Sequence, residues 1–181
     1  VWGQGGNFTT VFPNGGGAVS AAGFRLPTDV TLNSDGVMAV GDNQNNRVML
    51  FPAGVTPAFV PATTATVILG QLNATSFDYN QTSATNPNGI PGRGTLGFPR
   101  GSAISGIGSN LSLMVADAGN NRAMSYTGLN PAIAAYGALA ANVQGQLGLT
   151  MAWCSPTAPN YNPNFCPPFN SGKSNNPYPG P

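Results

Sequence analysis

The sequence contains no histidine, no glutamate and one lysine, Lys173, and only 6% of its 181 residues are charged. An ordinary soluble domain carries roughly 25% charged residues. Without these side chains the chain cannot form a histidine-liganded zinc site, a Ser-His-Asp or Cys-His nucleophile system, or a glutamate general base. We therefore predict that the protein is not an enzyme and uses no metal ion or other cofactor.

The five aspartates are scattered through the sequence and form no close pair. Calcium requires six to eight oxygen ligands, usually with several carboxylates among them. Asp29 and Asp35 flank one predicted hairpin, so a calcium ion at such a loop is an alternative to the prediction that the chain binds no metal.

The chain also lacks a basic cluster and a long apolar run. Its net charge is +1, which argues against a nucleic acid or an anionic membrane surface as partner. The longest apolar stretch, residues 132–143, includes a glycine and an asparagine and is shorter than the ~20 residues of a membrane helix. We predict no membrane span, and solubility must come from Asn, Thr, Ser and Gly or from attached glycans.

Glycans are suggested by the sequon N-x-S/T, which occurs four times without proline in the middle position. The candidate glycosylation sites are Asn7, Asn73, Asn80 and Asn110.

Cys154 and Cys166 are the only cysteines, and they lie in a segment rich in proline and asparagine. Their spacing is not C-x-x-C, and two thiols without histidine make a poor metal site, so we predict a disulfide. By the chain-entropy model, closing this short loop stabilises the fold by about 3 kcal/mol. A disulfide implies an oxidising compartment, and we expect a secreted protein, extracellular or at the cell surface. The first residue, Val1, fits a processed secreted chain and fits a fragment equally well.

An internal repeat organises the chain. A segment that begins at Pro27 returns 72 residues later at Pro99. Within it Asp42 corresponds to Asp117, and the pair Asn46 and Arg47 corresponds to Asn121 and Arg122, now 75 residues apart. The three additional residues lie in one turn, as expected for an insertion in a hairpin loop. The dipeptide Gly-Gln closes each unit and ends at Gln4, Gln71 and Gln146.

Each unit is predicted to contain four short strands. The β-rich runs are residues 30–32, 37–41, 48–51 and 66–69 in the first unit and 102–105, 111–116, 123–126 and 141–144 in the second. With 25 glycines and 17 prolines, long helices are not expected. The alanine-rich residues 132–141 are the one place where a helix is an alternative.

The two units, LPTDVTLNSDGVMAVGDNQNNRVMLF and FPRGSAISGIGSNLSLMVADAGNNRAMSY, resemble the NHL repeat, and their Gly-Gln ends resemble those of secreted bacterial NHL proteins. The resemblance implies an all-β fold of two four-stranded antiparallel blades of a β-propeller. The chain departs from the pattern at Gly41, at Ala123 and in the long insertion before Phe98.

The resulting organisation has five parts. We expect an N-terminal closing or donor strand (1–12), a first blade (24–71), an insertion (72–97), a second blade (98–146), and an extended, disulfide-stapled tail (147–181) with eight prolines.

The repeated Asp and Asn-Asn-Arg have two interpretations. A carboxylate and a guanidinium that recur on every blade could line a binding surface. We favour a structural role for Asp42, Asn46 and Arg47, and for their second copy Asp117, Asn121 and Arg122. Aspartate can accept backbone N–H bonds at a tight connection, asparagine tolerates left-handed conformations, and arginine can pair with the aspartate.

Propellers typically close with 4 to 8 blades, and two blades alone would leave apolar faces and strand edges open to water. The chain could be a fragment of a longer propeller, could form a ring with copies of itself, or could stack without closing. The last gives a filament, in which the N-terminal strand adds to a neighbour's sheet. We therefore predict a secreted, self-assembling structural glycoprotein whose partners are copies of itself, with glycans as further candidates.

Two other classes stay open. One is a ligand- or carbohydrate-binding propeller, in which Trp2, Trp153 or other aromatic residues stack on sugars. The other is an enzyme similar to the metal-dependent lyases among NHL propellers, but that activity relies on histidine ligands, which are absent here.

Overall fold

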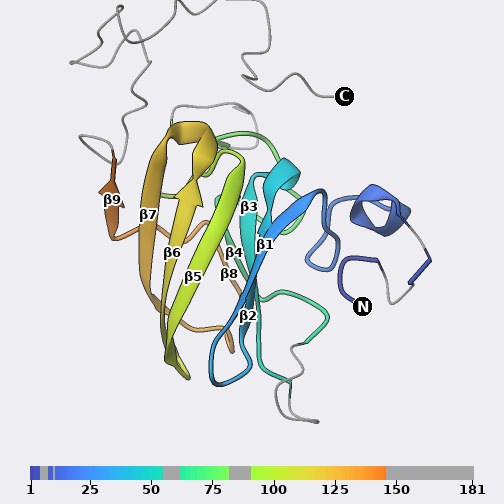
Figure 1. Ribbon diagram of the computed structural model, residues 1–181, viewed down its shortest axis with the longest axis horizontal. Coiled ribbons are helices and arrows are strands. Elements are labelled where there is room, and N and C mark those ends of the chain that lie inside the picture. Colours follow the sequence, from blue (N-terminus) through green and yellow to red (C-terminus); the bar gives the residue numbers. More distant parts are fainter. Residues whose placement is uncertain (5–7, 10, 55–61, 82–90, 146–181) are drawn as a thin grey trace, which may run out of the picture.

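The computed structural model describes residues 1–4, 8–9, 11–54, 62–81 and 91–145, and in these ranges the fold is all-β (Figure 1). The first sheet has the order β1 (Pro27–Leu32), β2 (Met38–Asp42), β3 (Arg47–Phe51), β4 (Val67–Leu69) and β8 (Ala135–Tyr136). The second sheet has the order β5 (Pro99–Ile107), β6 (Asn110–Asp117), β7 (Arg122–Leu129) and β9 (Asn142–Gln144). The short 3-10 turns are η1 (Pro13–Gly16), η2 (Asn43–Asn45) and η3 (Ala118–Asn120).

The predicted all-β character is confirmed, and each of the eight predicted β-rich runs overlaps an observed strand. Neighbouring strands within each repeat pair antiparallel, and the two sheets do not close into a barrel or ring within the described residues. The described part of the chain has no helix long and apolar enough to cross a membrane.

The helical alternative for the alanine-rich residues 132–141 is wrong. This segment contains β8, which pairs in parallel with β4 and gives the first sheet five strands, not four. The Ala135 amide donates to the Thr66 carbonyl at 2.9 Å, and the Gly137 amide donates to the Ile68 carbonyl at 3.0 Å. The edge of β4 offers these backbone partners, and they outweigh the weak helical preference of a short alanine run.

Only part of the predicted N-terminal strand (1–12) lies within the described residues. Residues 1–4 contain an isolated parallel bridge between Gly3 and Gly23. This segment packs on the first repeat. The Trp2 Nε1 donates to the Ala62 carbonyl at 3.0 Å, and the Trp2 ring packs against the apolar side chains of the first sheet.

The three additional residues of the second repeat do not enlarge the loop as expected. They lengthen the hairpin itself, because β5 has nine residues and β6 has eight, against six in β1 and five in β2. Gly106 and Gly108, which have positive φ values of 88° and 60°, allow the chain to reverse in a tight turn at the tip.

Apolar side chains fill the space between the two sheets, and we call this cluster the inter-sheet core. The first repeat contributes Val37, Ala39, Val48, Leu50, Val67 and Leu69. Leu96, Leu111, Leu113, Val115, Met124, Tyr126, Leu129 and Ala140 complete it. Because side chains alternate across a strand, every second residue of β2 and β3 points into this core.

The remaining side chains of the first sheet enter a second cluster, the N-terminal core. Its buried members are Phe24, Met38, Val40, Met49, Phe51, Ala65 and Ile68, with Trp2, Ala21 and Ala74 packed against them. The rings of Phe24 and Phe51 meet edge to face with centroids 5.7 Å apart. The N-terminal core therefore covers this face of the first sheet over β2, β3 and β4. Val30 and Leu32 of β1 lie on the same face and are 65% and 50% exposed, so the exposed apolar face that we expected is reduced to β1.

Leu50 and Ser125 occupy equivalent positions in the two repeats and give a matched test of this packing. Leu50 is fully buried in the inter-sheet core, whereas Ser125 is only half-buried. Leu50→Ala should lower the free energy of unfolding by about 2–5 kcal/mol because it leaves a cavity. Ser125→Ala should change it by less than about 0.5 kcal/mol. Urea denaturation measures both, and equal costs at the two positions would contradict the placement of the core.

Candidate functional site

Each repeat bends its chain at the motif that the sequence singled out. Strand β2 ends at Asp42, η2 turns the chain, and β3 begins at Arg47. Asn46 closes the turn in the left-handed region with φ 53°, and its amide donates to the Asn43 carbonyl at 3.0 Å. Asparagine adopts this conformation more readily than other residues that carry a side chain.

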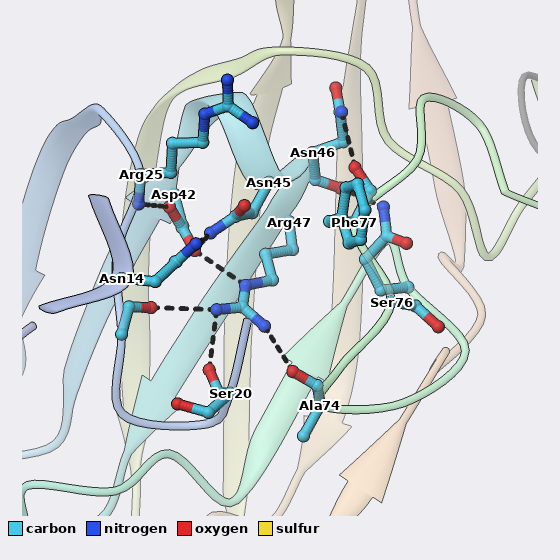
Figure 2. A network of polar contacts seen from close by, with 12 residues as sticks. Asn14, Ser20, Arg25, Asp42, Asn45, Asn46, Arg47, Ala74, Ser76 and Phe77 are labelled. Carbon is cyan, nitrogen blue, oxygen red and sulfur yellow. Dashed lines mark hydrogen bonds and ion pairs between the residues drawn. The ribbon is translucent and has the colours of Figure 1, made fainter. Parts of the chain in front are cut away.

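The centre of the first turn is a buried ion pair, shown in Figure 2. The Arg47 Nε lies 2.7 Å from the Asp42 Oδ2, and both side chains are 0% exposed. Asn45 donates its Nδ2 to the same oxygen at 2.8 Å, and the Arg25 amide donates to the Asp42 Oδ1 at 2.7 Å. Both carboxylate oxygens are therefore occupied by protein donors.

The rest of the Arg47 guanidinium connects distant segments of the chain. Its Nη1 donates to the Ala74 carbonyl at 2.8 Å. Its Nη2 donates to the carbonyls of Ser20 and Gly23 at 2.8 and 2.9 Å (Figure 2). The ion pair thus ties the segments before β1 and after β4 to the turn between β2 and β3.

The second repeat forms the same centre. Arg122 Nε lies 2.7 Å from Asp117 Oδ2, and Asn120 donates to that oxygen at 2.8 Å. The Gly97 amide donates to Asp117 Oδ1 at 2.6 Å. Arg122 Nη2 donates to the carbonyls of Gly92 and Thr95 at 2.9 and 3.0 Å. Two different loop sequences therefore wrap around one conserved geometry within this chain.

Burial dominates the electrostatics of both centres. It raises the pKa of the Asp42 and Asp117 carboxyls, although the paired guanidinium and the N–H donors favour the ionised form. Burial also lowers the pKa of Arg47. Such a pair adds little net stability but is costly to break, because removing one partner leaves a buried charge.

The carboxylates of Asp42 and Asp117 have no oxygen left for a substrate. Each aspartate oxygen already accepts protein hydrogen bonds, so neither carboxylate is placed to act as a base or to bind a ligand. Among the described residues, no three Cys, His, Asp or Glu side chains gather where they could hold a metal ion. The arrangement therefore acts as a structural clamp.

A second layer of polar contacts supports the turn of the second repeat. The Tyr79 hydroxyl oxygen lies 2.8 Å from both the Gly119 carbonyl oxygen and the Asn120 Oδ1, which share its single proton. Burial and the nearby Asp117 raise the pKa of Tyr79 to about 12, so the hydroxyl keeps its proton at neutral pH. Asn80 and Asn120 exchange two amide hydrogen bonds of 2.8 Å each.

The candidate glycosylation sites lie in different surroundings. Asn80 is 1% exposed and its amide is bonded to Asn120, so a glycan at Asn80 does not fit this fold. Asn73 is exposed, and its Oδ1 accepts bonds from the amides and hydroxyls of Thr75 and Ser76. Asn110 is exposed at the start of β6. Asn7, Cys154 and Cys166 lie outside the described residues.

Sequence reasoning missed several polar residues of the clamps. Asn45 and Asn120, the first asparagines of the two Asn-Asn-Arg motifs, bind the aspartates directly. Gln71 was noted only as a landmark of the repeat, but it is fully buried. Its Nε2 donates to the carbonyls of Asn46 and Asp78 at 2.9 and 2.8 Å. Recurrence of Asn-Asn-Arg and Gly-Gln at a fixed spacing was the available signal for these roles.

Arg47 and Arg25 provide a matched test of the clamp. Arg25 is exposed, and its Nε donates to the side chain of Gln44. Arg47→Met should lower the free energy of unfolding by about 3–5 kcal/mol because it leaves the buried Asp42 carboxylate without its cationic partner. Arg25→Met should change it by less than about 0.5 kcal/mol. Chemical denaturation followed by circular dichroism measures both, and a cost below about 1 kcal/mol for Arg47→Met would reject the clamp.

Comparison with protein-family models and curated proteins does not identify a family for this chain. No protein-family model matches the chain, and no curated protein matches it either. The resemblance of the two units to NHL repeats therefore stays a prediction from the sequence, and the function is argued from the described residues.

Proposed function

We propose that the protein is a non-enzymatic, secreted structural glycoprotein that assembles with copies of itself into an extracellular filament, and that its two sheets are propeller blades of the NHL type. One observation carries the self-assembly. Three large apolar side chains near the N-terminus, Phe8, Val11 and Phe12, are 86%, 87% and 62% exposed. Clusters of exposed apolar side chains mark interaction surfaces in soluble proteins.

The use of the charged residues supports a structural role. Four of the five aspartates hold the chain to itself. Asp42 and Asp117 lie in the clamps. Asp29 Oδ2 accepts the amide and the hydroxyl of Ser102 at 2.6 and 2.5 Å, and Asp35 accepts the Gly108 amide at 2.7 Å. Carboxylates engaged in this way serve the scaffold rather than acid–base chemistry.

The N-terminal segment lies at one end of the molecule. In Figure 1 the N-terminal segment with η1 lies at one end of the long axis, and β9 lies at the other. The Phe12 carbonyl accepts bonds from Gln4 Nε2 and the Gly15 amide, both at 3.1 Å. These bonds anchor the backbone while the Phe12 ring is exposed, so the segment can meet a neighbour without unfolding.

The contact proposed here is narrower than strand donation by the whole of residues 1–12. Trp2 and Gly3 already contact this chain. Within the described part of residues 1–12, Phe8, Val11 and Phe12 are the apolar side chains with the largest exposed fractions. Burying each of them on association contributes roughly 1.5–3 kcal/mol before the entropic cost of binding. With a net charge of +1, electrostatic repulsion between copies is small.

Replacing the three apolar residues tests the assembly. The variant Phe8→Ser, Val11→Ser, Phe12→Ser should lose filaments in negative-stain electron microscopy and sediment as small particles. Ile107→Ser is the matched control, because Ile107 is also largely exposed but lies in the hairpin of the second sheet. It should assemble like the wild type. Filaments that persist in the triple variant would contradict the proposed joint.

The glycoprotein part of the proposal has its own test. The intact mass of the native protein should exceed 18.4 kDa, and deglycosylation should remove the excess. Peptide mass spectrometry should locate glycans at the exposed Asn73 and Asn110 and find Asn80 unmodified, because Asn80 is buried in an amide pair. An intact mass equal to that of the bare chain would reject glycosylation.

A further inference from the structure

The outer face of the second sheet, which points away from the first sheet, differs from its counterpart in the first repeat. Five positions that are apolar in the first repeat are polar or small in the second. The equivalent pairs are Val37 and Ser112, Val48 and Ala123, Leu50 and Ser125, Val67 and Asn142, and Leu69 and Gln144. The first member of each pair lies in the inter-sheet core. The second member lies on a face that is partly or fully exposed.

The pairs follow from the register of the two sheets rather than from sequence alignment alone. Asp42 pairs with Arg47 across the hairpin of the first repeat, and Asp117 pairs with Arg122 across that of the second. Leu50 then pairs with Val67, and Ser125 pairs with Asn142. The same face of the same supersecondary unit is therefore apolar in one copy, and in the other it carries mainly polar and small side chains, with Met114 as its exposed large apolar residue.

A second set of residues shows the same change. Polar side chains of the first repeat bond to the β5–β6 hairpin. Asp35 accepts the Gly108 amide at 2.7 Å, and four others have equivalent positions in the second repeat. Thr28 and Asn43 donate to the Pro99 carbonyl at 3.2 and 3.1 Å, Asn33 donates to the Gly106 carbonyl at 3.1 Å, and Asp29 accepts from Ser102.

In the second repeat, three of these four positions carry residues that cannot make the same bonds, and the fourth carries an arginine. Arg100 stands where the first repeat has Thr28, Gly101 where it has Asp29, and Ala118 where it has Asn43. Ser105 takes the place of Asn33 and is too short to reach as far. The second repeat therefore lacks most of the large apolar side chains of this face and three of the four polar side chains by which the first sheet binds the second.

We infer that the second sheet is the terminal sheet of the array, and that its outer face remains in contact with water instead of receiving another sheet of this kind. Repeat arrays require terminal units with a polar outer face to stay soluble. A further sheet placed there would bury Ser125, Asn142 and Gln144 without the partners that the inter-sheet core and the polar side chains of the first repeat provide.

The opposite end of the array has a different cover. Trp2, Ala21 and Phe24 of the N-terminal core pack on the far face of the first sheet over β2, β3 and β4, while Val30 and Leu32 of β1 stay exposed on that face. The inference about the second sheet is independent of the proposed filament, because it applies equally to the isolated chain. For a filament it states which surface does not form the joint.

Cysteine labelling of the full-length native protein tests the inference directly. Ser125→Cys places a thiol on the outer face, and Ala39→Cys places one in the inter-sheet core, where Ala39 is fully buried. The proteins are treated with N-ethylmaleimide without reductant, and peptide mass spectrometry separates the new thiol from Cys154 and Cys166. Ser125→Cys should react within about tenfold of its rate in urea, and Ala39→Cys at least about a hundredfold more slowly, since only opening of the fold exposes it.

The labelling is done at low protein concentration and again in the assembled state. Rapid labelling of Ser125→Cys in both supports a hydrated terminal face. Protection of Ser125→Cys in the assembled state alone would show that another copy covers the face, and protection in both would show that the chain covers it itself. Either form of protection overturns the inference.

Restoring the residues of the first repeat provides the complementary test. The variant Ser112→Val, Ser125→Leu, Asn142→Val, Gln144→Leu is made together with the Phe8→Ser, Val11→Ser, Phe12→Ser replacements, so that association through the N-terminus does not contribute. It should associate in sedimentation velocity at concentrations at least about tenfold below those at which the N-terminal variant alone does. Unchanged sedimentation would overturn the inference, and if the variant fails to fold, the labelling pair decides alone.

Discussion

Each sheet is organised around a buried aspartate carboxylate, which needs hydrogen-bond donors from three different segments of the chain. Asp42 accepts from Arg25 before β1, from Asn45 in the turn, and from Arg47 at the start of β3. An ionised carboxylate away from water is tolerated only when it is paired and hydrogen-bonded. The turn can therefore reach its native form only when the preceding segment is in place. Arg47 extends the same dependence to Ser20, Gly23 and Ala74 and so couples local turn formation to tertiary assembly.

This arrangement shows how the protein uses its few charged side chains. The charged groups of the clamps and of the contact between the sheets face other parts of the same chain, so few remain to keep the surface hydrated. Asparagine, glutamine and serine take over this task on the outer face of the second sheet. Phe8 and Val11 are the most exposed of the large apolar side chains in the described residues.

Much of the fold could be predicted because the repeat is written in local patterns. Short β-rich runs between turn residues placed the eight strands, and the spacing of Asp, Asn and Arg indicated an ion pair at a left-handed turn. The prediction failed where the partner is distant. Strand β8 exists only because β4 of the other repeat offers it an edge. The hydrogen bonds from the backbone amides of Arg25 and Gly97 to Asp42 and Asp117 could not be predicted either. Every residue type except proline carries a backbone amide, so the sequence does not mark which amide will bind the carboxylate.

By itself, the sequence determined the strands, the turns and the pairing of Asp42 and Asp117 with the arginine five residues later in each case. These features depend on local alternation and short spacing. Only the tertiary structure decided which face of each sheet is covered and by what. Residues such as Met49 and Leu50 are equally apolar, and alternation alone says that they point in opposite directions. That Met49 packs under the N-terminal segment and Leu50 against the second sheet follows from long-range packing, in which apolar area leaves water only when another part of the chain arrives to cover it.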